Sequence, residues 1–155
     1  MFCRQSRFFS EENGARIDAI RRHLQGLELD EPLRSVMLTS LMEAADRVDS
    51  TCGVQMAYLK QYAARAKKPL ELRVPDVLPR AAAGKGQASC LDVKDAVQTL
   101  SADVAYLDPP YNQHSYLGNY HVWETLVLDD EPDFYGTACK RVDVKERKSE
   151  FNSKV

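Results

Sequence analysis

The chain has 155 residues, of which 44% are hydrophobic, and its formal net charge is -2 at pH 7. This length gives room for one domain with a real core, and the near-neutral charge argues against an extensive electrostatic footprint on DNA. Because the sequence has neither a run of 18 apolar residues nor the layout of a signal peptide, it predicts a cytoplasmic protein without a membrane span.

The cysteines and histidines do not form a metal-binding pattern. The four cysteines are far apart, and none of the three histidines stands at ligand spacing from them. We therefore expect no zinc site and reduced thiols, as is usual in the cytoplasm. Cys90 falls in a predicted strand and is expected to be a small core residue.

The first half of the chain predicts helices. Ser10 is a good N-cap, and apolar residues recur at helical spacing behind it, so a helix is expected from Glu11 to Gln25. A second helix is expected from Leu33 to about Val48, with Pro32 just before its start. A third is expected over about 55–66.

The third predicted helix is basic and carries interleaved tyrosines. Lys60 is its candidate DNA-backbone contact, and further cations follow at Arg65, Lys67, Lys68 and Arg73. The alternative is a solvated helix end, where cations interact favourably with the helix dipole. A short edge strand is expected next, from Leu70 to Val74, between two prolines.

The second half predicts an α/β arrangement. A flexible connection over 80–87 leads to a strand over 88–91, a helix over 93–100 and a strand over 104–107. Strand, helix and strand form a βαβ unit, which implies a parallel sheet with a right-handed crossover. Ligands of such sheets bind beyond the carboxyl ends of the strands, where Asp92 and Asp108 fall. The chain thus divides into a mainly helical part (1–80), a candidate DNA-facing part, and a partial α/β part (81–155) of one domain.

Residues 108–111 read Asp-Pro-Pro-Tyr and carry the chemistry. Proline fixes its own φ and keeps the preceding residue extended, so Asp108 and the carbonyl of Pro109 become preorganised acceptors beside the Tyr111 ring. Two acceptors beside a flat ring suit a planar base with an exocyclic amine. A base inside a duplex would have to be flipped out to reach them.

These four residues resemble the catalytic motif of the S-adenosylmethionine-dependent DNA adenine-N6 methyltransferases. Further segments are similar to the Dam-related, restriction–modification branch of that family: 4–20 (RQSRFFSEENGARIDAI), 41–54 (LMEAADRVDSTCGV), 68–74 (KPLELRV) and 119–126 (NYHVWETL). The resemblance extends from about Phe8 to Lys154. It implies a partial Rossmann-like class I methyltransferase sheet with a helical N-terminal part.

The resemblance also implies roles for individual residues. Asp108, Pro109, Pro110 and Tyr111 would be catalytic, the methyl donor would be S-adenosylmethionine, and the substrate would be double-stranded DNA with a flipped adenine. Asp92 would contact the adenine ring of the cofactor, although an aspartate before Val93 is also an excellent helix cap. In the polar loop 112–119, His114 and Tyr116 are candidate DNA contacts; the alternative is a mobile surface connection.

The glycine-rich loop that wraps the cofactor in class I methyltransferases has no counterpart in the sequence. Residues 143–155 are mostly polar, with Phe151 as the one large anchor. We therefore expect the middle part of a methyltransferase, with a second polypeptide as a candidate source of the cofactor loop. Alternatives are methylation of a protein amide or an RNA amine, and a non-catalytic remnant or DNA-binding module.

Overall fold

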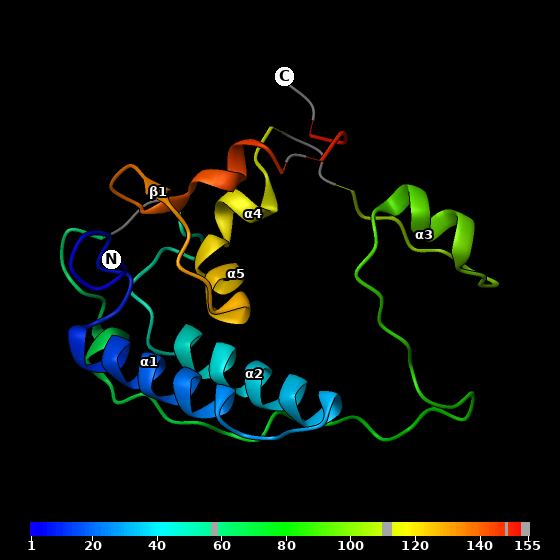
Figure 1. Ribbon diagram of the computed structural model, residues 1–155, viewed down its shortest axis with the longest axis horizontal. Coiled ribbons are helices and arrows are strands. Elements are labelled where there is room, and N and C mark those ends of the chain that lie inside the picture. Colours follow the sequence, from blue (N-terminus) through cyan, green and yellow to red (C-terminus); the bar gives the residue numbers. More distant parts are fainter. Residues whose placement is uncertain (57–58, 110–112, 148, 153–155) are drawn as a thin grey trace. The chain divides into compact units, whose positions relative to one another are not determined.

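The computed structural model describes residues 1–56, 59–109, 113–147 and 149–152 (Figure 1). The chain divides into two compact units. One combines Met1–Pro75 with Pro110–Val155, and the other is Asp76–Pro109. Among the described residues, no helix has the length and apolar character needed to cross a membrane, and no group of three or more His, Cys, Asp or Glu side chains gathers as a metal site.

Two long helices form the base of the first unit, and both were predicted. Helix α1 spans Glu11–Gln25, with Ser10 as its N-cap accepting a hydrogen bond from the backbone N–H of Asn13. Helix α2 spans Glu31–Asp46 and begins two residues before the predicted start. It begins earlier because Asp30 caps it and Pro32 occupies the first turn, where a missing N–H costs no hydrogen bond.

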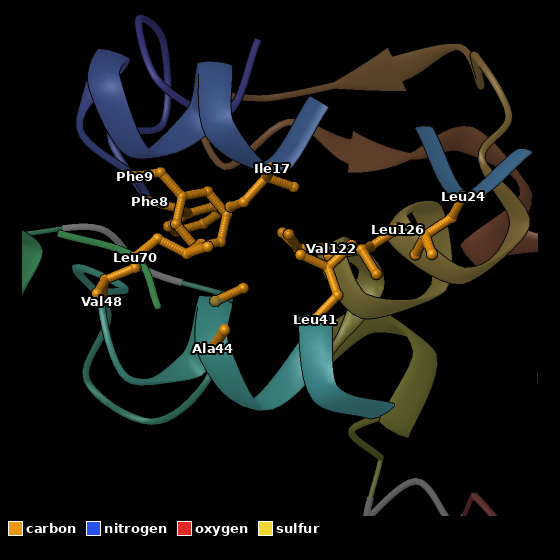
Figure 2. Close-up of a cluster of buried hydrophobic side chains, with 11 residues drawn as sticks. Phe8, Phe9, Ile17, Leu24, Leu41, Ala44, Val48, Leu70, Val122 and Leu126 are labelled. Atoms are coloured by element: carbon orange, nitrogen blue, oxygen red, sulfur yellow. The ribbon is translucent and has the colours of Figure 1, made fainter. Parts of the chain in front are cut away.

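The core of this unit lies where α1 and α2 meet α5, which spans His121–Leu128. Figure 2 shows Ile17 from α1, Leu41 from α2 and Val122 from α5 pointing toward one another. Phe8 and Phe9, from the segment before α1, fill the same cluster. Segments more than a hundred residues apart therefore share one apolar core.

The predicted helix over 55–66 is wrong. The described residues of this stretch form turns and a short 3₁₀ helix, η1, at Ala64–Lys67. Tertiary hydrogen bonds replace the helical ones. The Gln55 N–H donates to the Asn119 carbonyl, the Ala63 N–H donates to Ser50 Oγ, and the Ala66 carbonyl accepts from the Asn13 side chain.

The edge strand predicted over 70–74 is also wrong. Side chains of the two long helices bind its backbone in place of a neighbouring strand. The Oδ1 atom of Asn13 accepts from the Leu70 N–H, Ser40 donates to the Arg73 carbonyl, and Arg47 donates to the Glu71 carbonyl. The segment is held along the helices by side chains rather than by a ladder.

The C-terminal part of the first unit contains small elements that the sequence pattern did not predict. Helix α4 (Tyr116–Asn119) leads directly into α5; the hairpin of β1 (Phe134–Tyr135) and β2 (Lys140–Arg141) follows, and then the 3₁₀ helix η2 (Val142–Lys145). Phe151, the expected anchor, is 46% exposed.

Arg141 holds these small elements together. It is almost fully buried and donates to both oxygens of Asp130 at 2.7 Å and to Asp143 at 2.9 Å. These hydrogen bonds hold the pKa of Asp143 below its usual range. The guanidinium is thus fully matched by carboxylates, as a buried charge must be.

The second unit contains one regular helix, α3 (Val93–Thr99), close to the predicted helix. The strands predicted over 88–91 and 104–107 do not form, and no residue of 76–109 is buried. Cys90, expected in the core, is exposed. A parallel strand needs neighbours on its edges, and in the part of the chain that the structure describes the one sheet is the β1–β2 hairpin.

Candidate active site

Asp108 and Pro109 are the described part of the Asp-Pro-Pro-Tyr motif, and both are exposed. The side chains before them are exposed too: Val104 by 85%, Tyr106 by 90% and Leu107 by 73%. Pro110 and Tyr111 lie outside the described residues. Asp108 and Pro109, the two residues with the expected acceptor groups, are therefore accessible to a ligand.

Asp92 is the N-cap of α3. Its Oδ1 atom accepts a hydrogen bond from the backbone N–H of Lys94 at 2.9 Å, so the predicted helix cap is confirmed. The side chain is exposed, and α3 buries none of its residues. The cofactor contact assigned to Asp92 stays a prediction.

The residues of 76–109 do not by themselves enclose a cofactor the size of S-adenosylmethionine. A small-molecule site buries most of its ligand's surface, whereas every residue in this unit is exposed except the half-buried Gly84 and Ala96. This unit contains the two acidic residues expected at the site, Asp92 and Asp108. Its residues do not form a buried pocket around them.

The segment after the motif is more ordered than the predicted polar loop. Ser115 caps α4 by accepting a hydrogen bond from the Gly118 N–H at 3.0 Å. His114 is exposed, and its carbonyl accepts a hydrogen bond from the side chain of Asn152. Tyr116 is 52% exposed. Its ring stacks on that of Tyr120, with centroids 6.5 Å apart and planes 15° apart.

Tyr120, four residues after Tyr116, is 38% exposed. It lies at the junction of α4 and α5 with φ -128° and ψ 27°, so the chain bends there. Tyr120 is thus exposed, whereas Val122, two residues later, is buried. The sequence does contain a signal for this stacked pair. The two tyrosines stand four residues apart, on either side of Gly118, and this spacing brings side chains together on one face of a helical turn.

A three-way contact that sequence reasoning missed fixes this junction. The Gln55 N–H donates to the Asn119 carbonyl at 2.7 Å, and the Gln55 side-chain oxygen accepts from the Val122 N–H at 2.9 Å. The Gln55 carbonyl accepts from Nε2 of His121 at 3.1 Å. One glutamine therefore satisfies three groups of the α4–α5 junction.

His121 is fully buried beside the rings of Phe2 and Phe8. A carbonyl accepts its Nε2 hydrogen, so the neutral ring has a bare Nδ1, which is buried without a partner among the described residues. Burial lowers the pKa of His121 to about 4, and the nearby charges of Lys140 and Arg141 act in the same direction. His121 is a neutral structural residue at neutral pH.

Lys60, the candidate backbone contact, is exposed, and its carbonyl accepts a hydrogen bond from Arg7. Other cations of the basic stretch have structural partners: Arg65 pairs with Asp49, and Arg73 pairs with Glu71. Part of the positive charge of this stretch is therefore paired with carboxylates of the chain itself.

Residues 2–154 match the family described as D12 class N6 adenine-specific DNA methyltransferase. Among curated relatives, the type II methyltransferase M.NlaIII of Neisseria lactamica is 35% identical over 82% of this chain and 39% of its own length. M.FokI of Planomicrobium okeanokoites is 34% identical over 83% of this chain and 20% of its own length.

A third relative, modification methylase LlaI of Lactococcus lactis, is 30% identical over 87% of this chain and 22% of its own length. No solved structure matches the chain with significance. The chain thus spans well under half the length of these relatives. Because the family match covers nearly all of its residues, the chain belongs to the D12 class N6 adenine-specific DNA methyltransferases.

Proposed function

We propose that this chain is the catalytic-motif part of a site-specific DNA methyltransferase that transfers a methyl group from S-adenosylmethionine to N6 of adenine. The observation that carries the proposal is the Asp-Pro-Pro-Tyr motif within a family match over 2–154. The names of the relatives, two type II methyltransferases and a modification methylase, support a role in restriction–modification. An enzyme with that role would act on DNA in the cytoplasm.

Asp108 and Pro109 would activate the amine by accepting its hydrogens. The lone pair of an adenine amine is delocalised into the ring, which makes the nitrogen a weak nucleophile. With one N–H donating to the Asp108 carboxylate and the other to the Pro109 carbonyl, electron density stays on the nitrogen. The amine would keep both protons until the new C–N bond forms and the S–CH3 bond of the donor breaks; one proton would then leave the nitrogen, to the Asp108 carboxylate or to water. Acceptors fixed before the reaction need no reorganisation as positive charge develops.

Tyr111 would hold the adenine by stacking on its face, after the base has left the duplex. Stacking of a base on an aromatic side chain contributes about 1–3 kcal/mol in single-strand binders. His114, Tyr116 and Lys60 would contact the surrounding DNA; all three are exposed.

Completion of the cofactor site would come from a second polypeptide or a further segment that carries the glycine-rich loop. The open surroundings of Asp92 and Asp108 support this, and so do the exposed apolar side chains that precede the motif. With neighbouring strands supplied, 88–91 and 104–107 would join a parallel class I sheet, and Asp92 would reach the cofactor's adenine ring. In this arrangement 1–80 is the DNA-facing part and 81–155 the catalytic part.

The second candidate is a non-catalytic remnant that binds DNA. The absence of any buried residue in 76–109 favours it, because an unenclosed site cannot exclude water. The two candidates differ in one property: only the first gains methyl transfer when the missing segments are added.

Substitution of Asp108 tests the proposed chemistry in the completed enzyme. We expect Asp108→Ala to lower the rate of N6 methylation by about 10²–10³-fold, the usual cost of one preorganised transition-state contact. Asp108→Asn keeps one acceptor oxygen and should lose less. Asp103→Ala, which removes an exposed carboxylate five residues earlier, should leave the rate unchanged. A rate that survives Asp108→Ala would exclude the proposed role.

A further inference from the structure

Tyr116 and Tyr120 form an aromatic surface whose orientation the fold sets. The two rings are nearly parallel, 15° apart, and both remain exposed although they stack on each other. Because they share one orientation, a planar ring stacks on either with the same tilt. Exposed parallel aromatic rings are the surface on which single-strand binders stack bases.

The backbone under the two tyrosines is held from several sides. Ser115 caps α4, and Gln55 binds the backbone N–H or carbonyl of residues on both sides of Tyr120. Gly118 is buried against η2: a Cβ at this position would lie 2.9 Å from Ser115 Oγ and 3.4 Å from a methyl group of Val144. A surface held this firmly loses little conformational freedom when it binds.

One cation lies beside the aromatic pair. The Lys140 ammonium lies 4.0 Å from the position that a Cβ on Gly118 would occupy, next to α4. The other cations of this region are paired: Arg141 with Asp130 and Asp143, and Arg147 with Asp143 and Glu124. Lys140 is therefore the group offered here as a contact for a phosphate.

The chain itself keeps this surface close to the motif. Tyr116 follows Tyr111 by five positions, so the two Cα atoms are at most about 18 Å apart in any conformation. This is the range of a few nucleotides along a DNA strand.

We propose that Tyr116 and Tyr120 together form a stacking site for a second, unstacked DNA base near the one that enters the motif. The proposal rests on the proposed DNA substrate and adds Tyr120 as a positioning residue. A base that loses its partner when the adenine flips out, and then leaves the stack, exposes both faces, and a fixed aromatic ring shields one of them.

The test is binding of the full chain, without cofactor, to labelled oligonucleotide duplexes that carry 2-aminopurine opposite an abasic site, compared with intact duplexes. Stacking on a tyrosine quenches 2-aminopurine emission. We expect tighter binding to the abasic duplex, with quenching. Tyr116→Ala and Tyr120→Ala should each weaken that binding roughly tenfold and restore emission, whereas Tyr→Phe at either position should preserve both signals.

Phe134→Ala is the matched control, because it removes another exposed aromatic ring, 44% exposed, from the β1–β2 hairpin of the same unit. Circular dichroism and thermal melting verify that each variant folds. Unchanged affinity and emission in both alanine variants would overturn the proposal, and so would the absence of any preference for the abasic duplex.

Loss of binding to a co-expressed polypeptide, with DNA affinity intact, would also overturn it and would assign the surface to protein contact. Since no methyl transfer is measured, a negative result leaves the proposed methyltransferase chemistry standing. Conversely, an inactive enzyme that still shows tyrosine-dependent quenching would refute the chemistry alone.

Discussion

His121 shows how one buried side chain makes the stability of the first unit depend on pH. The ring is neutral, donates from Nε2 to the Gln55 carbonyl and has an Nδ1 that is buried without a hydrogen-bond partner among the described residues. Protonation would place a second N–H and a positive charge in that environment without a partner. Burial therefore lowers the pKa of His121 to about 4 from its ordinary 6.5.

The pH dependence follows from this difference. Between pH 6.5 and 4 the unfolded chain takes up a proton at His121 that the folded chain does not, so stability is complete above this window and falls as the pH drops through it. The loss is on the order of 3 kcal/mol at pH 4. Asp143 does not interfere, because Arg141 holds the pKa of that carboxyl lower still.

Urea unfolding at pH 7.5 and pH 5.0 measures the effect. The wild-type chain should be less stable at pH 5.0, and His121→Phe, which cannot titrate, should lose most of that difference while being destabilised at both pH values. An unchanged pH dependence in the variant would show that another group is responsible.

Residue-level expectations from the sequence succeeded where the interaction is local. Ser10 and Asp92 were predictable as helix caps because each bonds a backbone N–H two or three positions away. The role of Gln55 was not predictable, since its partners at 119–122 are more than 60 positions distant. No local pattern marks a glutamine whose main chain and side chain both bind a remote helix junction.

At the scale of the elements, Asn13 connects α1 to the segment that follows η1. It is buried, and its amide nitrogen donates to the carbonyls of Ala66 and Lys68 while its oxygen accepts from the Leu70 N–H. One side chain on a helix thus fixes the segment that follows η1. Its position in the first turn of α1 makes α1 the support of that segment.

Asn13→Ala removes all three bonds and leaves buried backbone groups without partners. We expect it to destabilise the chain by about 2–4 kcal/mol, since each unpaired buried group costs about 1–3 kcal/mol before relaxation. Arg16→Ala, which breaks an exposed ion pair with Glu12 on the same helix, should change stability by less than about 0.5 kcal/mol. Equal effects of the two substitutions in chemical denaturation would refute the structural role of Asn13.

Helices with a local N-cap were predictable as elements: α1, α2 and α3 all lie close to their expected ranges. The errors have a common physical cause. The segments 55–66 and 70–74 have helical or strand patterns, but side chains from α1, α2 and Ser50 bind their backbone groups. Long-range hydrogen bonds decided the structure in both places.

At the scale of the whole molecule, the two units differ in how far their residues are buried. The first unit has an apolar core of helical residues, and the second has exposed apolar side chains before the motif. The sequence predicted strands there because their pattern is that of a buried parallel sheet. A pattern describes the environment in which a segment is stable, and the described residues of this chain do not supply that environment to 88–91 and 104–107.

The matched relatives are much longer than this chain, and their additional residues are a source of neighbouring strands for 88–91 and 104–107. The chain spans 39% of M.NlaIII and 20% of M.FokI. A methyltransferase sheet assembled from two segments would bury the strands before Asp92 and Asp108 and bring both carboxylates to one edge. We therefore expect the chain alone to lack methyl-transfer activity and to gain it with its complement.

The most direct measurement is methyl transfer from labelled S-adenosylmethionine to unmethylated DNA, followed by identification of the methylated base. It would be made with this chain alone and with this chain plus the polypeptides encoded on either side of it. We expect N6-methyladenine with the combination, none with the chain alone, and none with the combination carrying Asp108→Ala. Absence of N6-methyladenine in every mixture, or a methyl group on another base, would contradict this expectation.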